Sequence, residues 1–185
     1  MKRVIVLVAL CLLLVNLVLV AGADVAYPLV GASGVYTLVN LHPDEQRHRL
    51  YSVNYQLTGL IPLCSKVRIE SVDSRKMTFR LLDSDREYEY IFHNSLRDPI
   101  PKHLDKFFGK RCDAALEGLS EVDRRGIRAG TVLSGMSKRG VTLAIGYPPE
   151  HATPSLDSDI WMYWINRFGK MTVSFANGKV VGISR

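Results

Sequence analysis

Five histidines and three cysteines are the side chains of this 185-residue chain that best suit metal binding or nucleophilic chemistry. No two histidines have the short helical or hairpin spacing of a zinc site, and no cysteine pair accompanies them. The sequence also lacks the G-x-S-x-G pattern of a nucleophile elbow and a glycine-rich phosphate loop. The histidines are His42, His48, His93, His103 and His151. This distribution predicts a non-enzymatic protein with no metal ion and no cofactor.

Cys64 and Cys112 lie outside the N-terminal hydrophobic run and are a candidate disulfide pair. If the chain is exported, as argued below, it folds in an oxidising compartment where such a bond persists. The alternative is two buried free thiols, because the sequence does not show whether their Cα atoms lie within disulfide reach. The sequence leaves both interpretations open.

The aromatic run from Ile160 to Trp164 is the first candidate binding surface. In a strand, Trp161 and Tyr163 point to one face, and Met162 and Trp164 point to the other. We expect one pair to face the core and the other to be available to a partner, since aromatic residues are enriched at interfaces. The alternative is a sheet covered on both faces. Trp161, Tyr163 and Trp164 are therefore candidate partner-binding residues.

The segment 147–156 leads into this strand and is the second candidate contact region. Two prolines follow Tyr147 and a third stands at position 154, which stiffens the chain. Long loops that precede a rigid strand often carry binding residues, so Tyr147 and His151 are also candidate partner-binding residues. The alternative is a connection that only covers one end of a sheet.

Residues 1–23 have the three regions of a secretory signal peptide. Lys2 and Arg3 supply the positive start, residues 4–20 are aliphatic apart from Asn16, and a small-residue exit ends at Ala23. A retained membrane anchor is the alternative, because the run approaches the roughly 20 residues that span a bilayer. A lipid anchor is not favoured, since Cys11 lies inside the run. The sequence predicts a periplasmic or secreted protein and leaves an association with the outer membrane open.

The chain is mildly basic. Its net charge is +6, and Lys2 and Arg3 contribute two of these charges, which leaves +4 for the remainder. This charge suits peripheral contact with an anionic membrane surface. No run of Lys and Arg exceeds two residues, so nucleic acid is not predicted as a partner.

Residues 35–95 have the pattern of several short strands separated by turns. Residues 66–72 alternate polar and apolar side chains with a period of two. Residues 86–92 repeat this alternation, with Tyr88, Tyr90 and Phe92 on one face. Short strands with turns about every ten residues predict a small antiparallel β-barrel, SH3-like in type, over residues 35–95.

Residues 99–185 differ in composition and form the second predicted domain. A short helix is expected at 102–108, with Gly109 as its cap, and another helix between an N-cap at Ser137 and a stop at Gly146. Three strands follow at 160–164, 170–175 and 179–183, and Asn177-Gly178 is a strong hairpin signal. The predicted fold class is α+β, with helices packed on an antiparallel three-stranded sheet.

Four short motifs follow one another in this second domain. They are Gly135-Met136-Ser137-Lys138, Ala144-Ile145-Gly146-Tyr147-Pro148, Trp161-Met162-Tyr163 and Val173–Val180. In this order and spacing, over roughly residues 130–183, they resemble the SmpA/OmlA (BamE-like) family of outer-membrane assembly lipoproteins. The resemblance implies helices packed on an antiparallel sheet, as in the β-lactamase inhibitory proteins (BLIP). The chain departs from the family because it lacks a lipid-anchor cysteine and carries the segment 35–95.

The resemblance also implies a function. It implies a protein-binding or scaffolding module with a partner in the cell envelope, in outer-membrane protein assembly or envelope maintenance. The alternative is a secreted inhibitor or ligand-binding protein that uses the face of the same C-terminal sheet. A shared fold does not transfer a function, so both remain expectations.

Overall fold

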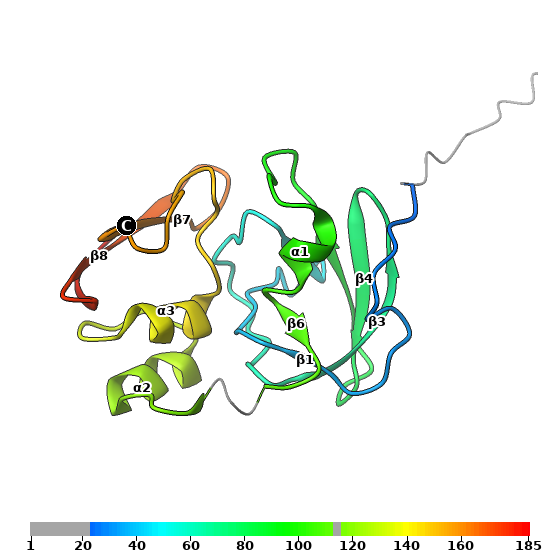
Figure 1. Ribbon diagram of the computed structural model, residues 1–185, viewed down its shortest axis with the longest axis horizontal. Coiled ribbons are helices and arrows are strands. Elements are labelled where there is room, and N and C mark those ends of the chain that lie inside the picture. The colour runs from blue at the N-terminus through cyan, green and yellow to red at the C-terminus, as the bar shows by residue number, and fades with distance from the viewer. Residues whose placement is uncertain (1–22, 113–115) are drawn as a thin grey trace, which may run out of the picture.

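The computed structural model describes residues 23–112 and 116–185. The expected signal peptide, residues 1–23, lies outside the described residues except for Ala23. The described chain is a mixed α+β fold whose two sheets lie in separate halves of the molecule (Figure 1). Within these two ranges, none of the helices has the length and hydrophobicity of a membrane span.

The first half is built around a curled six-stranded sheet with the order β2-β5-β4-β3-β1-β6 (Figure 1). The predicted strand 66–72 is present with the expected bounds, and the predicted strand 86–92 is one residue shorter at each end. The strands are β1 (Val35–Thr37), β2 (Arg49–Tyr51), β3 (Lys66–Val72), β4 (Lys76–Leu81), β5 (Glu87–Ile91) and β6 (Phe108–Gly109).

Strand β3 shows how the period of two builds this sheet. Val67 and Ile69 are buried and face the core, as their alternation predicts. A β-bulge between Ile69 and Ser71 then adds one residue to the strand. Because of this extra residue, Val72 also turns inward, opposite Met77 of β4.

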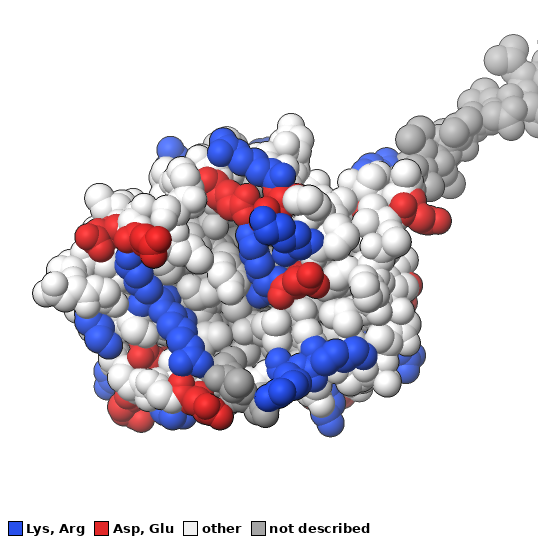
Figure 2. Space-filling model, viewed as in Figure 1, with Lys and Arg blue, Asp and Glu red and all other residues white. Residues whose placement is uncertain are grey.

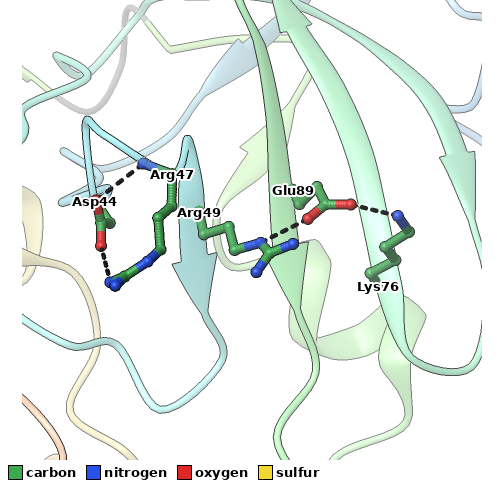
Figure 3. A network of polar contacts seen from close by, with 5 residues as sticks. All are labelled: Asp44, Arg47, Arg49, Lys76 and Glu89. Atoms are coloured by element: carbon green, nitrogen blue, oxygen red, sulfur yellow. Dashed lines mark hydrogen bonds and ion pairs between the residues drawn. The ribbon is translucent and has the colours of Figure 1, made fainter.

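The sheet differs from the predicted antiparallel barrel because β2 runs parallel to β5. No short hairpin joins these two strands, so the chain can return in the same direction. Glu89 of β5 accepts hydrogen bonds from Lys76 of β4 and from Arg49 of β2, the latter at 2.7 Å (Figure 3). These two bonds lower the pKa of Glu89, so a charged carboxylate links three neighbouring strands. Asp44 holds the turn before β2 through two bonds from Arg47 (Figure 3).

The first sheet also takes residues from the segment assigned to the second domain. Helix α1 (Ile100–Leu104) overlaps the expected helix 102–108 but begins and ends earlier. Leu38 N–H donates to the Phe107 carbonyl at 2.8 Å, and β6 then pairs with β1. Gly109 is therefore a strand residue and not a helix cap, because backbone pairing with β1 draws the chain out of the helix.

Cys64 and Cys112 form a disulfide, with their Cα atoms 5.5 Å apart. The bond joins the segment that enters β3 to the segment that leaves β6, 48 residues later in the sequence. Of the two interpretations left open by the sequence, the structure has the disulfide.

The second half consists of two helices and the predicted three-stranded antiparallel meander, with the order β7-β8-β9. Ser137 accepts a hydrogen bond from Gly140 N–H at 2.9 Å and is the N-cap of α3, as predicted. Asn177-Gly178 forms the last turn. The elements are α2 (Glu121–Ala129), α3 (Lys138–Ile145), β7 (Ile160–Trp164), β8 (Lys170–Ala176) and β9 (Lys179–Ser184).

Amide side chains of the first half join it to the second. The Asn40 amide donates to the carbonyls of Ile127 at 2.7 Å and of Ala144 at 3.1 Å, at the ends of α2 and α3. The Asn54 amide donates to the carbonyls of Ile145 and Tyr147, both at 2.8 Å. Carbonyls at a helix end have no partner within the helix, so these amides satisfy them. One continuous cluster of buried hydrophobic side chains also runs through both halves.

Candidate functional site

Trp161 and Tyr163 lie on the inner face of the C-terminal sheet and are buried. The Trp161 ring packs against Phe175 with 4.8 Å between the ring centroids. The Tyr163 hydroxyl donates to the Gly146 carbonyl at 3.0 Å. These two predicted partner-binding residues are therefore core residues, because the apolar face of the sheet packs toward the helices and alternate residues share that face. A partner cannot reach them in the folded protein.

The opposite face of β7 carries the aromatic ridge, which we define as Ile160, Met162 and Trp164. Ile160 is 62% exposed, and the other two side chains are half-buried. The next strand presents small polar side chains on this face, at Thr172 and Ser174. The ridge is thus an apolar row beside a row of small polar side chains. Of the two alternatives left by the sequence, the structure has the sheet with one face partly open, and not the sheet covered on both faces.

His151 and Lys170 hold Trp164 in place. The indole N–H of Trp164 donates to His151 Nε2 at 3.3 Å, and the two rings stack with their centroids 6.3 Å apart. Lys170 Nζ lies 4.9 Å from the centroid of the indole ring, which is a cation–π distance. The indole N–H is only a donor, so His151 accepts on Nε2 and keeps its proton on Nδ1. Burial, and then the charges of His93 and Arg97, lower the pKa of His151 and favour this neutral form.

Tyr147 and His151 also line a small cleft between α1 and the loop that follows α3. The cleft has a volume of about 30 Å³, which is enough for one or two water molecules. Its walls include Ser52, His103, Phe107 and Pro149. The structure thus brings Tyr147, His151 and Trp164 into one region, whereas Trp161 and Tyr163 lie on the other side of the sheet.

Lys106 and Glu150 line the cleft, and Lys106 also contacts Asp98. Lys106 Nζ lies 2.6 Å from Asp98 and 2.6 Å from Glu150. Burial works against the charge on Lys106, but its bonds to Asp98 and Glu150 outweigh this and raise the pKa of Lys106. Hydrogen bonds from Lys102 and Lys106 hold the pKa of Asp98 well below its usual range. Sequence analysis missed this group because the three residues are far apart in the chain and no local pattern links them.

His103 forms the floor of the cleft and pairs with Tyr90. His103 Nε2 lies 2.9 Å from the Tyr90 hydroxyl, and both side chains are buried. Burial lowers the pKa of His103 to about 4, with a further lowering from the charge of Lys106. The same burial raises the pKa of Tyr90. His103 is therefore neutral at pH 7 and serves as a hydrogen-bonded core residue.

His93 and Ser95 are the one described pair that superficially resembles a base and a nucleophile. His93 Nδ1 lies 2.8 Å from Ser95 Oγ, but the same nitrogen also accepts the Ser95 backbone N–H at 3.2 Å. Both contacts span two residues, so the pair forms a local turn. No carboxylate among the described residues orients the other nitrogen of the His93 ring, as a triad would require.

The C-terminal sheet combines exposed apolar side chains with positive charge. Residues 160–185 include four cationic side chains and no Asp or Glu. On the face seen in Figure 2, Lys and Arg form several separate groups, most of which have Asp or Glu beside them. The exposed large hydrophobic side chains of the last thirty residues are Leu156, Ile160, Phe168, Val181 and Ile183.

The described residues contain no group of three or more His, Cys, Asp or Glu side chains arranged to hold a metal ion. Comparisons of the chain with known protein families, with curated proteins and with solved structures gave no match.

Proposed function

We propose that this chain is a non-enzymatic protein of the cell envelope that binds another protein through the outer face of its C-terminal sheet. The observation that carries the proposal is the aromatic ridge, an apolar row with one exposed and two half-buried side chains, on a strand whose other side chains form the core. Contiguous exposed apolar surface is typical of interaction sites. Within the ridge, Trp164 is held by His151 and Lys170, so a partner meets a preformed position of this side chain.

The arrangement of the second half supports a BamE-like identity of the SmpA/OmlA type. The N-cap at Ser137, the helix stop at Gly146 and the turn at Asn177 all lie where the motifs require them. We propose an SH3-like identity for the first half on its small, strongly curled sheet. With residues 1–23 as an export signal, these identities favour a periplasmic module in outer-membrane protein assembly or envelope maintenance.

The cleft supports the non-enzymatic part of the proposal. Its ionisable groups pair with one another: Lys106 with two carboxylates, and His103 with Tyr90. A general acid or base has to be free to reach a substrate proton. Groups that are already held in ion pairs or hydrogen bonds are better suited to stabilising the junction between the two halves.

A photo-cross-linking experiment tests the binding face. A photoreactive amino acid is placed at Ile160 in the chain lacking residues 1–23, and in a matched control at Leu82, which is also exposed but lies in the first half. Both proteins are irradiated in envelope extract. We expect one discrete adduct from position 160, and its loss when Trp164→Ala is added to a variant that still folds. Equal adducts from both positions, or none from position 160, would refute the proposal.

A further inference from the structure

The outer edge of β9 is only partly covered by the rest of the chain. The segment Gly135–Ser137 covers its start, where it bridges Lys179 and exchanges two backbone hydrogen bonds with Val180, both at 2.8 Å. Beyond Val180 this cover ends. On the side away from β8, no hydrogen bond joins Gly182–Ser184 to any described segment.

The register of the sheet shows which backbone groups face this open edge. Phe175 N–H donates to the Asp159 carbonyl on the β7 side. Backbone groups alternate in direction along a strand, so those of Val173 also point toward β7. Ile183 lies opposite Val173, and its own N–H and C=O must therefore point away from β8. Ile183 thus presents a donor and an acceptor that no described residue uses.

The side chains along this edge are aliphatic. Val181 is 61% exposed and Ile183 is 39% exposed. Natural sheets usually protect such an edge with a charged side chain, a proline or a covering segment, because an open edge is a template for another strand. Here neither a charge nor a proline stands between Lys179 and Arg185, and the covering segment stops short.

A pocket of about 180 Å³ reaches the end of β9 through Arg185, the residue that directly follows this strand. Its walls include Thr131 and Val132 from the connection between α2 and α3, Met171 of β8, and Arg185. When an extended peptide adds to a sheet edge, main-chain bonds supply affinity and pockets for alternate side chains supply specificity. The Arg185 guanidinium would favour a carboxylate at this end.

The charges and the unpaired backbone groups at the open edge of β9 distinguish between three possible binding partners. Antiparallel pairing of two β9 strands in the register centred on Gly182 would bring Lys179 of one copy beside Arg185 of the other, and facing like charges are destabilising. A lipid surface also fits poorly, because acyl chains cannot pair with the backbone groups of Ile183. An extended segment with acidic residues at its ends satisfies both the edge and the cations.

We propose that the open edge of β9 binds an extended peptide segment of a partner protein by β-strand addition, with apolar residues at its centre and acidic residues at its ends. This proposal rests on the proposed function and adds a second contact, distinct from the aromatic ridge. Ile183 supplies the main-chain hydrogen bonds, and Lys179 and Arg185 select the acidic ends.

Two terminally blocked peptides test the proposal, one with the sequence Asp-Val-Thr-Val-Thr-Asp and one with Lys in place of both Asp. The chain lacking residues 1–23 is titrated with each peptide, and amide exchange is followed by NMR. We expect the acidic peptide to slow exchange of the Ile183 amide at least tenfold, because that N–H gains a partner. The Lys peptide should leave the exchange rate unchanged.

Two variants separate the edge from general effects on folding. Ile183→Pro removes only an outward-facing N–H, so β8 and β9 stay paired, and we expect affinity for the acidic peptide to fall at least tenfold. Arg185→Glu should lower the affinity for the acidic peptide and raise the affinity for the Lys peptide. Partial unfolding cannot produce this reversal. Leu82→Ala, at an exposed residue of the first half, should change neither affinity.

The proposal fails if neither peptide protects Ile183, if Arg185→Glu does not reverse the preference, or if sedimentation shows a dimer that Ile183→Pro abolishes. Its failure is separable from that of the proposed function. If the adduct formed at position 160 persists in Ile183→Pro and no peptide protects Ile183, the edge proposal is overturned and the ridge proposal stands. If position 160 forms no adduct but the peptide effects occur, the ridge proposal is overturned and the strand addition stands as a contact of its own.

Discussion

At the scale of single residues, the buried polar side chains are used to hold the molecule together. Asn54 has a positive φ of 51° and is buried, and it donates two hydrogen bonds to carbonyls at and just beyond the end of α3. Asparagine tolerates this backbone conformation better than most residues. The same position could not be recognised from the sequence, because its partners lie more than ninety residues further along the chain.

His103 makes folding stability depend on pH. Its pKa is lowered from 6.5 to about 4 in the folded protein, so the unfolded chain binds a proton more readily. The contribution of neutral His103 to the free energy of unfolding is complete above pH 6.5 and is lost as the pH falls through 4. The loss amounts to about 3 kcal/mol. We predict that the free energy of unfolding, measured in urea, falls across this window and falls less in His103→Gln.

The exposed His93 provides the control for this measurement. His93→Gln should follow the wild-type curve. A wild-type stability that is flat between pH 6.5 and 4, or an equal flattening in both variants, would contradict the role given to His103. The buried His42, whose pKa burial also lowers, adds to the same trend and keeps the His103→Gln curve from becoming fully flat.

At the scale of elements, one carboxylate organises the start of both longer helices. Asp123 accepts hydrogen bonds from the Ser120 hydroxyl at 2.7 Å and from Ser137 N–H at 2.7 Å, the N-cap residues of α2 and α3. Gly140 leaves room for it, since a Cβ there would lie 2.0 Å from an Asp123 oxygen. Burial favours the neutral carboxyl, but the serine bonds outweigh it and lower the pKa of Asp123.

Removal of this shared carboxylate should lower the free energy of unfolding more than removal of one N-cap side chain does. We predict that Asp123→Ala lowers the free energy of unfolding by about 2 kcal/mol, because both caps lose their partner. Ser137→Ala should cost about 1 kcal/mol, as a single cap does. Urea unfolding followed by circular dichroism measures both. Equal losses in the two variants would show that Asp123 supports only one helix.

At the scale of the whole molecule, the two halves share packing and hydrogen bonds across their junction. Asn40 and Asn54 cross the junction, and one hydrophobic cluster spans it. Both tryptophans, Trp161 and Trp164, lie in the second half, whereas the disulfide lies in the first. Tryptophan fluorescence therefore reports on one half while the disulfide is varied in the other.

We predict that loss of the disulfide destabilises both halves together. Closure of a loop of 48 residues is worth about 4 kcal/mol in the chain-entropy account. Cys112→Ser should shift the tryptophan-detected urea transition to lower concentration while leaving it a single step, and the reduced wild type should match it. A fluorescence transition that does not move would mean that the halves unfold independently.

Local patterns in the sequence determined helix α3 and the three strands of the second half. Ser137 and Gly146 bound α3, and Asn177-Gly178 joins β8 to β9, since caps and tight turns depend on residues close together in the chain. The same holds for the alternation that makes β3 and β5 strands. These features are encoded within a few residues, so the sequence alone could predict them.

Tertiary structure decided the pairing and the facing of these elements. The parallel pair β2–β5, the addition of β6 to the first sheet and the disulfide all depend on segments that meet only after folding. The alternation along β7 showed two possible faces, but only packing turned Trp161 inward and Trp164 outward. A strand pattern specifies which residues share a face, whereas burial of that face depends on what the rest of the chain places against it.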